Sequence, residues 1–165
     1  MPEFIDAFQT RLASGYENEH EDLSIIACGP MVPEAMRAAT ILKRDFGYET
    51  RVLNMHTLKP IDEEAIVRAA KETGVIITAE EHQIGALAWR VSNVITSDEK
   101  VYGTPVITGA IGVKDRFGDS GAPWELVKEF EVSAEHIAAK AVELMGIKKT
   151  RQVEHREIAF AAVER

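Results

Sequence analysis

The sequence predicts an α/β fold, a three-layer α/β/α sandwich in which helices cover both faces of a parallel sheet. Short apolar runs alternate with segments of helical period along most of the chain. These runs do not alternate apolar with polar residues, so both faces of each strand should be buried. Strands separated by helices are joined by crossovers, which makes neighbouring strands parallel.

The first strand and helix are bounded by glycine and proline. Residues 23–28, LSIIAC, form an apolar run that stops at Gly29 and Pro30, as a buried strand does before a turn. Alanines and larger apolar residues then recur at helical spacing. Pro33 and Gly47 mark the expected start and end of this helix.

The second unit repeats this pattern without repeating the sequence. Residues 50–55, TRVLNM, are the next expected strand. Asp62 is placed to cap the following helix, and Gly74 is expected to end it. Ile61 and Ile66 are spaced for a hydrophobic staple across the cap.

The next part of the chain supplies two more strands. Residues 75–80, VIITAE, and residues 104–111, TPVITGAI, are the expected strands, with a helix near 86–96 between them. A glycine-rich loop, GVKDRFGDSGAP, follows the fourth strand and leads to a short helix that Pro123 opens. All four strands therefore follow the same strand, loop and helix pattern.

We expect one globular domain with two flanking segments. A chain of 165 residues has the size of a single domain. Residues 1–22 are an expected lead-in, residues 23–146 the domain, and residues 147–165 a charged, helical tail. The last helix of the domain should be capped by the Ser133 side chain and end at Gly146.

Composition and charge exclude several classes of function. Hydrophobic residues make up 45% and charged residues 28% of the chain, as in ordinary globular proteins. The formal net charge is −8, so no basic field is available to bind nucleic acid. Cys28 is the single cysteine and cannot form an internal disulfide. Neither a membrane span nor a signal peptide is recognisable, so we expect a cytoplasmic protein that contacts no membrane.

A cluster of acids and a histidine, Glu80-Glu81-His82, ends the third expected strand. Ligands of parallel sheets bind outside the carboxyl ends of the strands, so this cluster lies at the functional edge. His82 could be a base that a carboxylate orients. It could also join His56 and Glu80 at a metal, although their spacing is not diagnostic. In the third reading, the cluster hydrogen-bonds the next helix or contacts another subunit.

The glycine-rich loop allows three further readings. Lys114, Arg116 and Ser120 could bind an anion together with backbone N–H groups. Asp115, Arg116 and Phe117 could form an interface, because arginine and aromatic residues dominate protein contacts. The loop could also be an ordinary surface connection. Ser120 lies in GDSGA, which lacks the spacing of a serine hydrolase motif, and no phosphate-binding glycine motif follows any strand.

Three segments in a fixed order resemble the C-terminal domain of transketolase-type enzymes. They are LSIIACGPMVPEAMRAATIL, RVLNMHTLKPIDEEAIVRAAKETGVIITAEEHQIG and GVKDRFGDSGAPWELVKEFEVSAEHIAAKAVELM, and they run from about Leu23 to Gly146. Pyruvate dehydrogenase β-type subunits and deoxyxylulose-phosphate synthase end in a similar domain. The resemblance implies a mixed, mostly parallel sheet of about five strands, to which the stretch before Leu23 could add an antiparallel edge strand.

The resemblance also implies an activity for the complete enzyme. Transketolases are transferases of the pentose phosphate pathway, and they move two-carbon ketol units between sugar phosphates with thiamine diphosphate and a divalent cation such as Mg²⁺. In the family, the cofactor lies between two other domains, one of which carries a GDG motif. This chain has no GDG, and FGDSG at 117–121 is a different motif. We therefore expect the chain alone to bind neither thiamine diphosphate nor Mg²⁺ and to be inactive.

The resemblance favours an assembly role for the acidic cluster. Glu81 and His82 match the family's strand-end motif, in a domain that mainly packs and dimerises. We therefore expect a homodimer and contacts with the thiamine-binding domains or subunits. The family often has two glycines after this motif, where this chain has Gly85 and Ala86. The alternatives are a domain of an enzyme acting on 2-oxo acids and a freestanding ligand-sensing or adaptor module.

Overall fold

The computed structural model describes residues 10–11 and 20–163, and its centre is a five-stranded sheet of order β1-β3-β2-β4-β5. The strands are β1 (Thr10–Arg11), β2 (Leu23–Ala27), β3 (Thr50–Asn54), β4 (Val75–Gln83) and β5 (Ile107–Val113). β1 pairs antiparallel with β3, and the other three pairings are parallel. The mixed, mostly parallel sheet and its antiparallel edge strand are confirmed.

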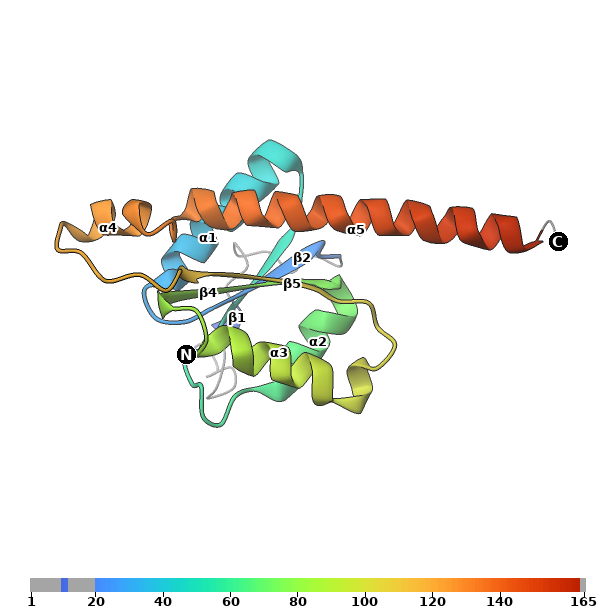
Figure 1. Cartoon of the computed structure of the whole chain (residues 1–165), viewed down its shortest axis with the longest axis horizontal. Helices are drawn as coiled ribbons and strands as arrows, with labels where there is room; N and C mark the ends of the chain where they lie inside the picture. The colour runs from blue at the N-terminus through green and yellow to red at the C-terminus, as the bar shows by residue number, and fades with distance from the viewer. Residues whose placement is uncertain (1–9, 12–19, 164–165) are drawn as a thin grey trace, which may run out of the picture.

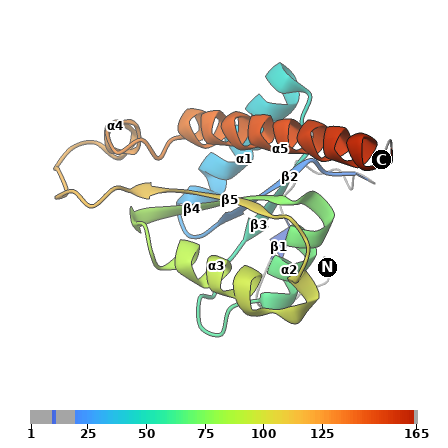
Figure 2. The same ribbon diagram turned by 45° about the vertical axis from the view of Figure 1, so that its right-hand side comes forward.

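Helices cover both faces of this sheet, which confirms the three-layer sandwich (Figure 1). One face carries α1 (Met31–Ile41), its continuation η1 (Leu42–Phe46) and α5 (Ala134–Val163), and α1 and α5 pack side by side (Figure 2). The other face carries α2 (Glu63–Thr73) and α3 (Leu87–Ser97). The short helices η2 (Glu99–Val101) and α4 (Pro123–Glu129) complete the element order. No helix in the described ranges combines the length and the apolar character needed to cross a membrane.

Alternate residues of the three inner strands, β2, β3 and β4, enter two separate cores. Ile25 and Ile77 pack with α1 and α5, whereas Ile26 and Ile76 pack with α2 and α3. All four side chains are fully buried. Successive side chains of a strand point to opposite faces, so a strand covered on both sides needs an unbroken apolar run. This explains why the predicted strands show no polar alternation.

Glycine and aspartate set the boundaries of α2 as predicted. Asp62 Oδ1 accepts a hydrogen bond of 2.9 Å from the backbone N–H of Ala65, which is the expected N-cap contact. Gly74 ends the helix in the left-handed conformation, with φ 66°. The predicted start of α1 is wrong by two residues, because α1 begins at Met31 and Pro33 lies within its first turn. Proline fits there, since the first N–H groups of a helix have no partner in the helix.

The start of α5 is not capped as predicted. The Ser133 hydroxyl donates to the Glu135 carboxylate at 2.5 Å, and this hydrogen bond lowers the pKa of Glu135. The backbone N–H of Ala134 donates instead to Glu34 Oε2 of α1, at 2.9 Å. A carboxylate from the neighbouring helix therefore meets the positive end of α5.

The predicted helix end at Gly146 is also wrong, because α5 continues to Val163 and projects beyond the sheet (Figure 1). Contacts with the domain hold α5 just before and just after Gly146. Lys148 Nζ donates to the carbonyl oxygen of Thr73 at 2.8 Å, and a Cβ at Gly109 would lie only 2.9 Å from Leu144 Cδ1. Tertiary contacts on both sides of a helical glycine outweigh its weak propensity of about 1 kcal/mol. The division of the chain at residue 146 stays a prediction.

Replacing Gly146 with alanine should stabilise the protein by about 0.5–1 kcal/mol, because a methyl group there meets no atom within 4 Å and the backbone is helical. Gly47→Ala is the matched control. Its Cβ would be equally free, but φ is 70°, so this change should destabilise by about 1 kcal/mol. Urea denaturation followed by circular dichroism measures both changes. Destabilisation by Gly146→Ala would show that α5 is broken at this residue in solution.

Candidate functional site

The predicted acidic cluster lies at the carboxyl end of β4, which is three residues longer than expected. The strand runs to Gln83, where it pairs with Val113 of β5 after an irregularity in register. Glu80 is the last buried residue of the strand, whereas Glu81, His82 and Gln83 are exposed. The cluster is therefore divided between the interior and the surface.

Glu80 binds the start of the next helix. Its side chain is fully buried, and its two oxygens accept from the backbone N–H groups of Gly85 at 3.0 Å, Leu87 at 2.8 Å and Ala88 at 3.4 Å. Ala86, the residue preceding α3, has no side chain that could do this. The carboxylate thus satisfies unpaired N–H groups and meets the positive end of the helix dipole.

These contacts correct the interface prediction for Glu80, because a fully buried side chain that contacts its own chain cannot reach a partner. The reading in which the cluster hydrogen-bonds the next helix is confirmed for this residue. Gly112 of β5 makes the arrangement possible. A Cβ there would lie 2.8 Å from Ile84 Cγ1 and 3.1 Å from Glu80 Cγ. The sequence alone placed Gly112 in the loop after the fourth expected strand, so this close approach was not foreseen.

His82 is poorly placed to act as an oriented base. Its Nδ1 lies 3.4 Å from Glu80 Oε2 and 3.2 Å from the carbonyl oxygen of Gln83, and the side chain is half exposed. A catalytic base is usually held by hydrogen bonds of about 2.6–3.2 Å, and the carboxylate oxygen of Glu80 lies beyond that range. The oxygens of Glu80 are also already engaged by the start of α3.

The predicted metal ligands do not come together. His56 is exposed, and its Nδ1 lies 2.9 Å from the Thr57 hydroxyl. Within residues 10–11 and 20–163, no group of three or more histidine, cysteine, aspartate or glutamate side chains could hold a metal ion. Cys28 offers no activated nucleophile either. Burial raises the pKa of its thiol, and the charges of Glu80 and Glu81 raise it further, which disfavours the reactive thiolate.

The anion site expected at Lys114, Arg116 and Ser120 stays a prediction, and both of its cations are paired with carboxylates. Lys114 Nζ lies 2.5 Å from Glu131 Oε2, and this contact lowers the pKa of Glu131. Arg116 donates to Glu129 Oε1 at 2.8 Å, its guanidinium lies 4.3 Å from the ring centroid of Phe130, and the hydrogen bond with Glu129 raises its pKa. Both positive charges are thus matched by carboxylates, which repel an anion.

A groove of about 580 Å³ lies beside this loop, and we call it the β4–α4 groove. Its floor is apolar and consists of Met31, Val113, Leu126, Val127, Phe130 and Val132. Its rim carries polar side chains, which are Glu34, Glu81, His82, Gln83 and Arg116. Segments from α1, β4, β5 and α4 meet here, so sequence patterns within single elements gave no sign of the groove.

The comparison with known families decides what this domain is. A family model described as "Transketolase, C-terminal domain" matches residues 15–137, which is most of the chain. The chain belongs to the transketolase C-terminal domain family. The resemblance seen in the sequence is therefore confirmed.

Relatives of this transketolase domain include separate sections and subunits. The "Putative transketolase C-terminal section" of Methanocaldococcus jannaschii is 42% identical over 126 residues, which are 76% of this chain and 37% of that protein. A 6-deoxy-6-sulfo-D-fructose transketolase subunit of Clostridium sp. is 37% identical over 134 residues, 81% of this chain and 40% of that protein. The chain thus spans well under half the length of these relatives.

The domain is shared with enzymes of other names. A 1-deoxy-D-xylulose-5-phosphate synthase of Heliobacterium modesticaldum is 32% identical over 130 residues, 79% of this chain and 20% of that protein. Among solved structures, "Split gene transketolase, inactive beta4 tetramer" aligns with TM-score 0.72 and 34% identity, over 84% of this chain and 42% of that chain. Similarity to the domain therefore does not fix the reaction.

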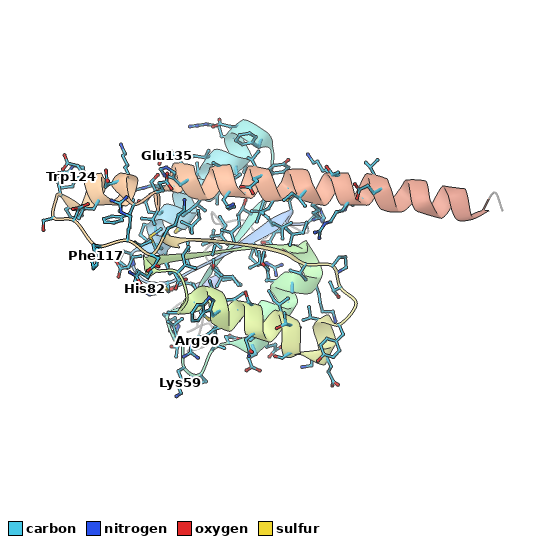
Figure 3. The ribbon with its side chains drawn as sticks, in the orientation of Figure 1. Lys59, His82, Arg90, Phe117, Trp124 and Glu135 are labelled. Atoms are coloured by element: carbon cyan, nitrogen blue, oxygen red, sulfur yellow. The ribbon has the colours of Figure 1, made fainter. Side chains whose placement is uncertain are left out.

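The remaining predicted interface residues of this transketolase domain are on its surface. Glu81, His82, Asp115 and Arg116 are exposed, and the Phe117 side chain is 97% exposed. Figure 3 shows Phe117, His82 and Trp124 at one end of the molecule. Trp124 is 71% exposed, and this could not be foreseen because an aromatic residue at the start of a helix is as typical of a core as of a surface. Their participation in an interface stays a prediction.

Proposed function

We propose that this domain is the assembly domain of a thiamine diphosphate-dependent transketolase and that it is inactive alone. The observation that carries the proposal is the division at the end of β4. The Glu80 carboxylate is buried and bonded to the start of α3, while Phe117 and Trp124 extend into solvent at the end of the molecule where His82 lies (Figure 3). Exposed aromatic side chains of this kind are typical anchors of protein interfaces.

The residues present do not fit thiamine diphosphate or Mg²⁺. Binding of a magnesium diphosphate requires carboxylate or carbonyl ligands close together and cations free to meet phosphate oxygens. The described residues offer no cluster of three acidic or histidine ligands, and Lys114 and Arg116 pair with carboxylates. In the proposed enzyme, the cofactor is therefore held by the thiamine-binding domains, and two-carbon transfer in the pentose phosphate pathway takes place there.

The proposed partners are the thiamine-binding domains or subunits and a second copy of this domain in a homodimer. Two of the relatives are named as a section and a subunit, which supports assembly from separate parts. The solved relative titled an inactive β4 tetramer supports self-association of chains that carry this domain. Two-fold symmetry is the commonest closed arrangement. The cytoplasmic location belongs to the same proposal, since sugar phosphate metabolism takes place there.

A second candidate keeps the assembly role and changes the reaction. The similarity to a 1-deoxy-D-xylulose-5-phosphate synthase favours an enzyme that decarboxylates a 2-oxo acid. Product analysis of the reconstituted enzyme separates the two candidates. Carbon dioxide release from pyruvate would identify the second, and ketol transfer without carbon dioxide would identify the first.

Calorimetric titration of the chain with thiamine diphosphate and MgCl₂ should give no binding heat, and the chain alone should transfer no ketol units. Adding the thiamine-binding region of the same organism's transketolase should produce a complex in light scattering and restore turnover. An equal mass of an unrelated α/β protein is the control. Turnover by the chain alone would overturn the proposal, and so would the absence of any complex.

A further inference from the structure

Beyond a general assembly role, we infer that the β4–α4 groove receives an arginine or lysine side chain of the partner. The inference rests on the proposed function for the identity of that partner, which is the thiamine-binding region. The evidence is the combination of an apolar floor, an unpaired carboxylate on the rim and exposed aromatic side chains beside it.

The shape of the groove suits a long side chain with an apolar stem. Its volume of about 580 Å³ falls in the range of about 300–1,000 Å³ in which proteins bind compact groups. Met31, Leu126 and Val132 are among the side chains of its floor. Arginine and lysine bury their methylene stems on such surfaces and keep the charged head at the rim. A short acidic or polar side chain would leave the floor uncovered.

The negative charge of Glu81 on the rim of the groove favours a positively charged partner side chain. Glu81 is exposed, and among the described residues its carboxylate has no hydrogen bond or ion pair within the chain. Arg116 adds little positive field, because Glu129 and Asp119 lie 2.8 and 3.4 Å from its guanidinium. The raised pKa of the Cys28 thiol, to which Glu80 and Glu81 contribute, reports the same negative field. A partner cation at this rim would form an ion pair with Glu81, the carboxylate that has no ion pair among the described residues of the rim.

The partner is a better source of this cation than a second copy of the chain. The chain carries a formal charge of −8, so two copies approaching through acidic surfaces repel each other. Phe117 and Trp124 enlarge the apolar contact on the side of the loop and α4.

The first test is a charge reversal in the assembled enzyme. Glu81→Lys should weaken association with the thiamine-binding region at least about tenfold, because a like charge would face the partner cation. Glu64→Lys is the matched control, since Glu64 is exposed on α2 and the change in charge is the same. We expect this control to change the Kd less than about twofold. Glu81→Lys should melt near the wild-type temperature because its side chain is exposed, whereas Glu64→Lys should melt slightly lower because Glu64 lies in the first turn of α2.

A second test needs no partner, and it shows whether the groove binds a cationic side chain even if no complex forms. The probe is N-acetyl-L-arginine amide, and its neutral analogue N-acetyl-L-citrulline amide is the control. In amide NMR spectra, the arginine probe should shift Gln83, Val113 and Gly118, and these shifts should disappear in Glu81→Lys. If the wild type forms no complex but the arginine shifts appear, the proposed function fails and the cation site stands.

Three outcomes would overturn the inference. The first is a complex that Glu81→Lys leaves as tight as the control does. The second is equal shifts with the citrulline probe, which would make the groove an apolar ligand site. The third is a self-associated form of the chain that only Glu81→Lys dissociates, which would place a second copy in the groove.

Discussion

Replacing Glu80 with alanine should lower the free energy of unfolding by about 3 kcal/mol. The change removes the acceptor for the N–H groups of Gly85, Leu87 and Ala88 at the buried start of α3. A buried donor left without a partner costs about 1–3 kcal/mol, and local rearrangement recovers part of the sum for three. Urea denaturation followed by circular dichroism measures the effect.

Glu81→Ala is the matched control for this variant. Glu81 is the next residue of the same strand, but its side chain is exposed, so we expect a change within about 0.5 kcal/mol. Glu80→Gln should fall between the two, because an amide oxygen accepts hydrogen bonds while the amide NH₂ faces donors. Equal stability of the Glu80 and Glu81 alanine variants would refute the capping role.

Replacing Arg51 with alanine should destabilise the domain by about 3–5 kcal/mol. Arg51 Nε donates to Glu21 Oε2 at 2.6 Å, and its terminal nitrogen also pairs with Glu72. The side chains of Arg51 and Glu21 are 9% and 3% exposed. Removing the cation takes the guanidinium away from the buried Glu21 carboxylate, and breaking such a buried pair from one side carries a cost of this size.

The double variant Glu21→Gln/Arg51→Met should recover much of the stability lost in Arg51→Ala, because both members of the buried ion pair are then neutral. Arg68→Ala, an exposed position on α2, is the control and should change stability by less than about 0.5 kcal/mol. The four proteins are compared by thermal unfolding. If the double variant is as unstable as Arg51→Ala, the cost lies in lost packing and not in the broken ion pair.

The layers of the fold were predictable because local signals and tertiary structure agree. Asp62 and Gly74 bound α2 where the sequence placed them. Elsewhere, distant contacts override the local signal. β4 reaches Gln83 because β5 offers Val113 as a pairing partner, and α5 passes Gly146 because Lys148 binds the end of α2. Neither contact can be read from the residues next to it in sequence.

For the candidate site, the sequence predicted the position of the cluster but not which of its side chains are buried and which are exposed. Parallel topology put Glu80, Glu81 and His82 at the functional edge of the sheet. Burial then separates them, since Glu80 enters the domain and its neighbours do not. The loop cations looked free in the sequence, yet Arg116 meets Glu129, thirteen residues further along. Side-chain pairing over such distances depends on the packing of α4, which no local pattern reports.

The projecting part of α5 gives the domain a lever arm. From Lys148 to Val163 the helix rises about 22 Å. Lys148 also donates to the carbonyl oxygen of Asp22 at 3.3 Å, and Lys149 Nζ donates to the Tyr48 hydroxyl at 2.9 Å, so the base of the rod is clamped from several directions. A rotation of the sheet by a few degrees would therefore displace the end of the helix at Val163 much further than its clamped part at Lys148.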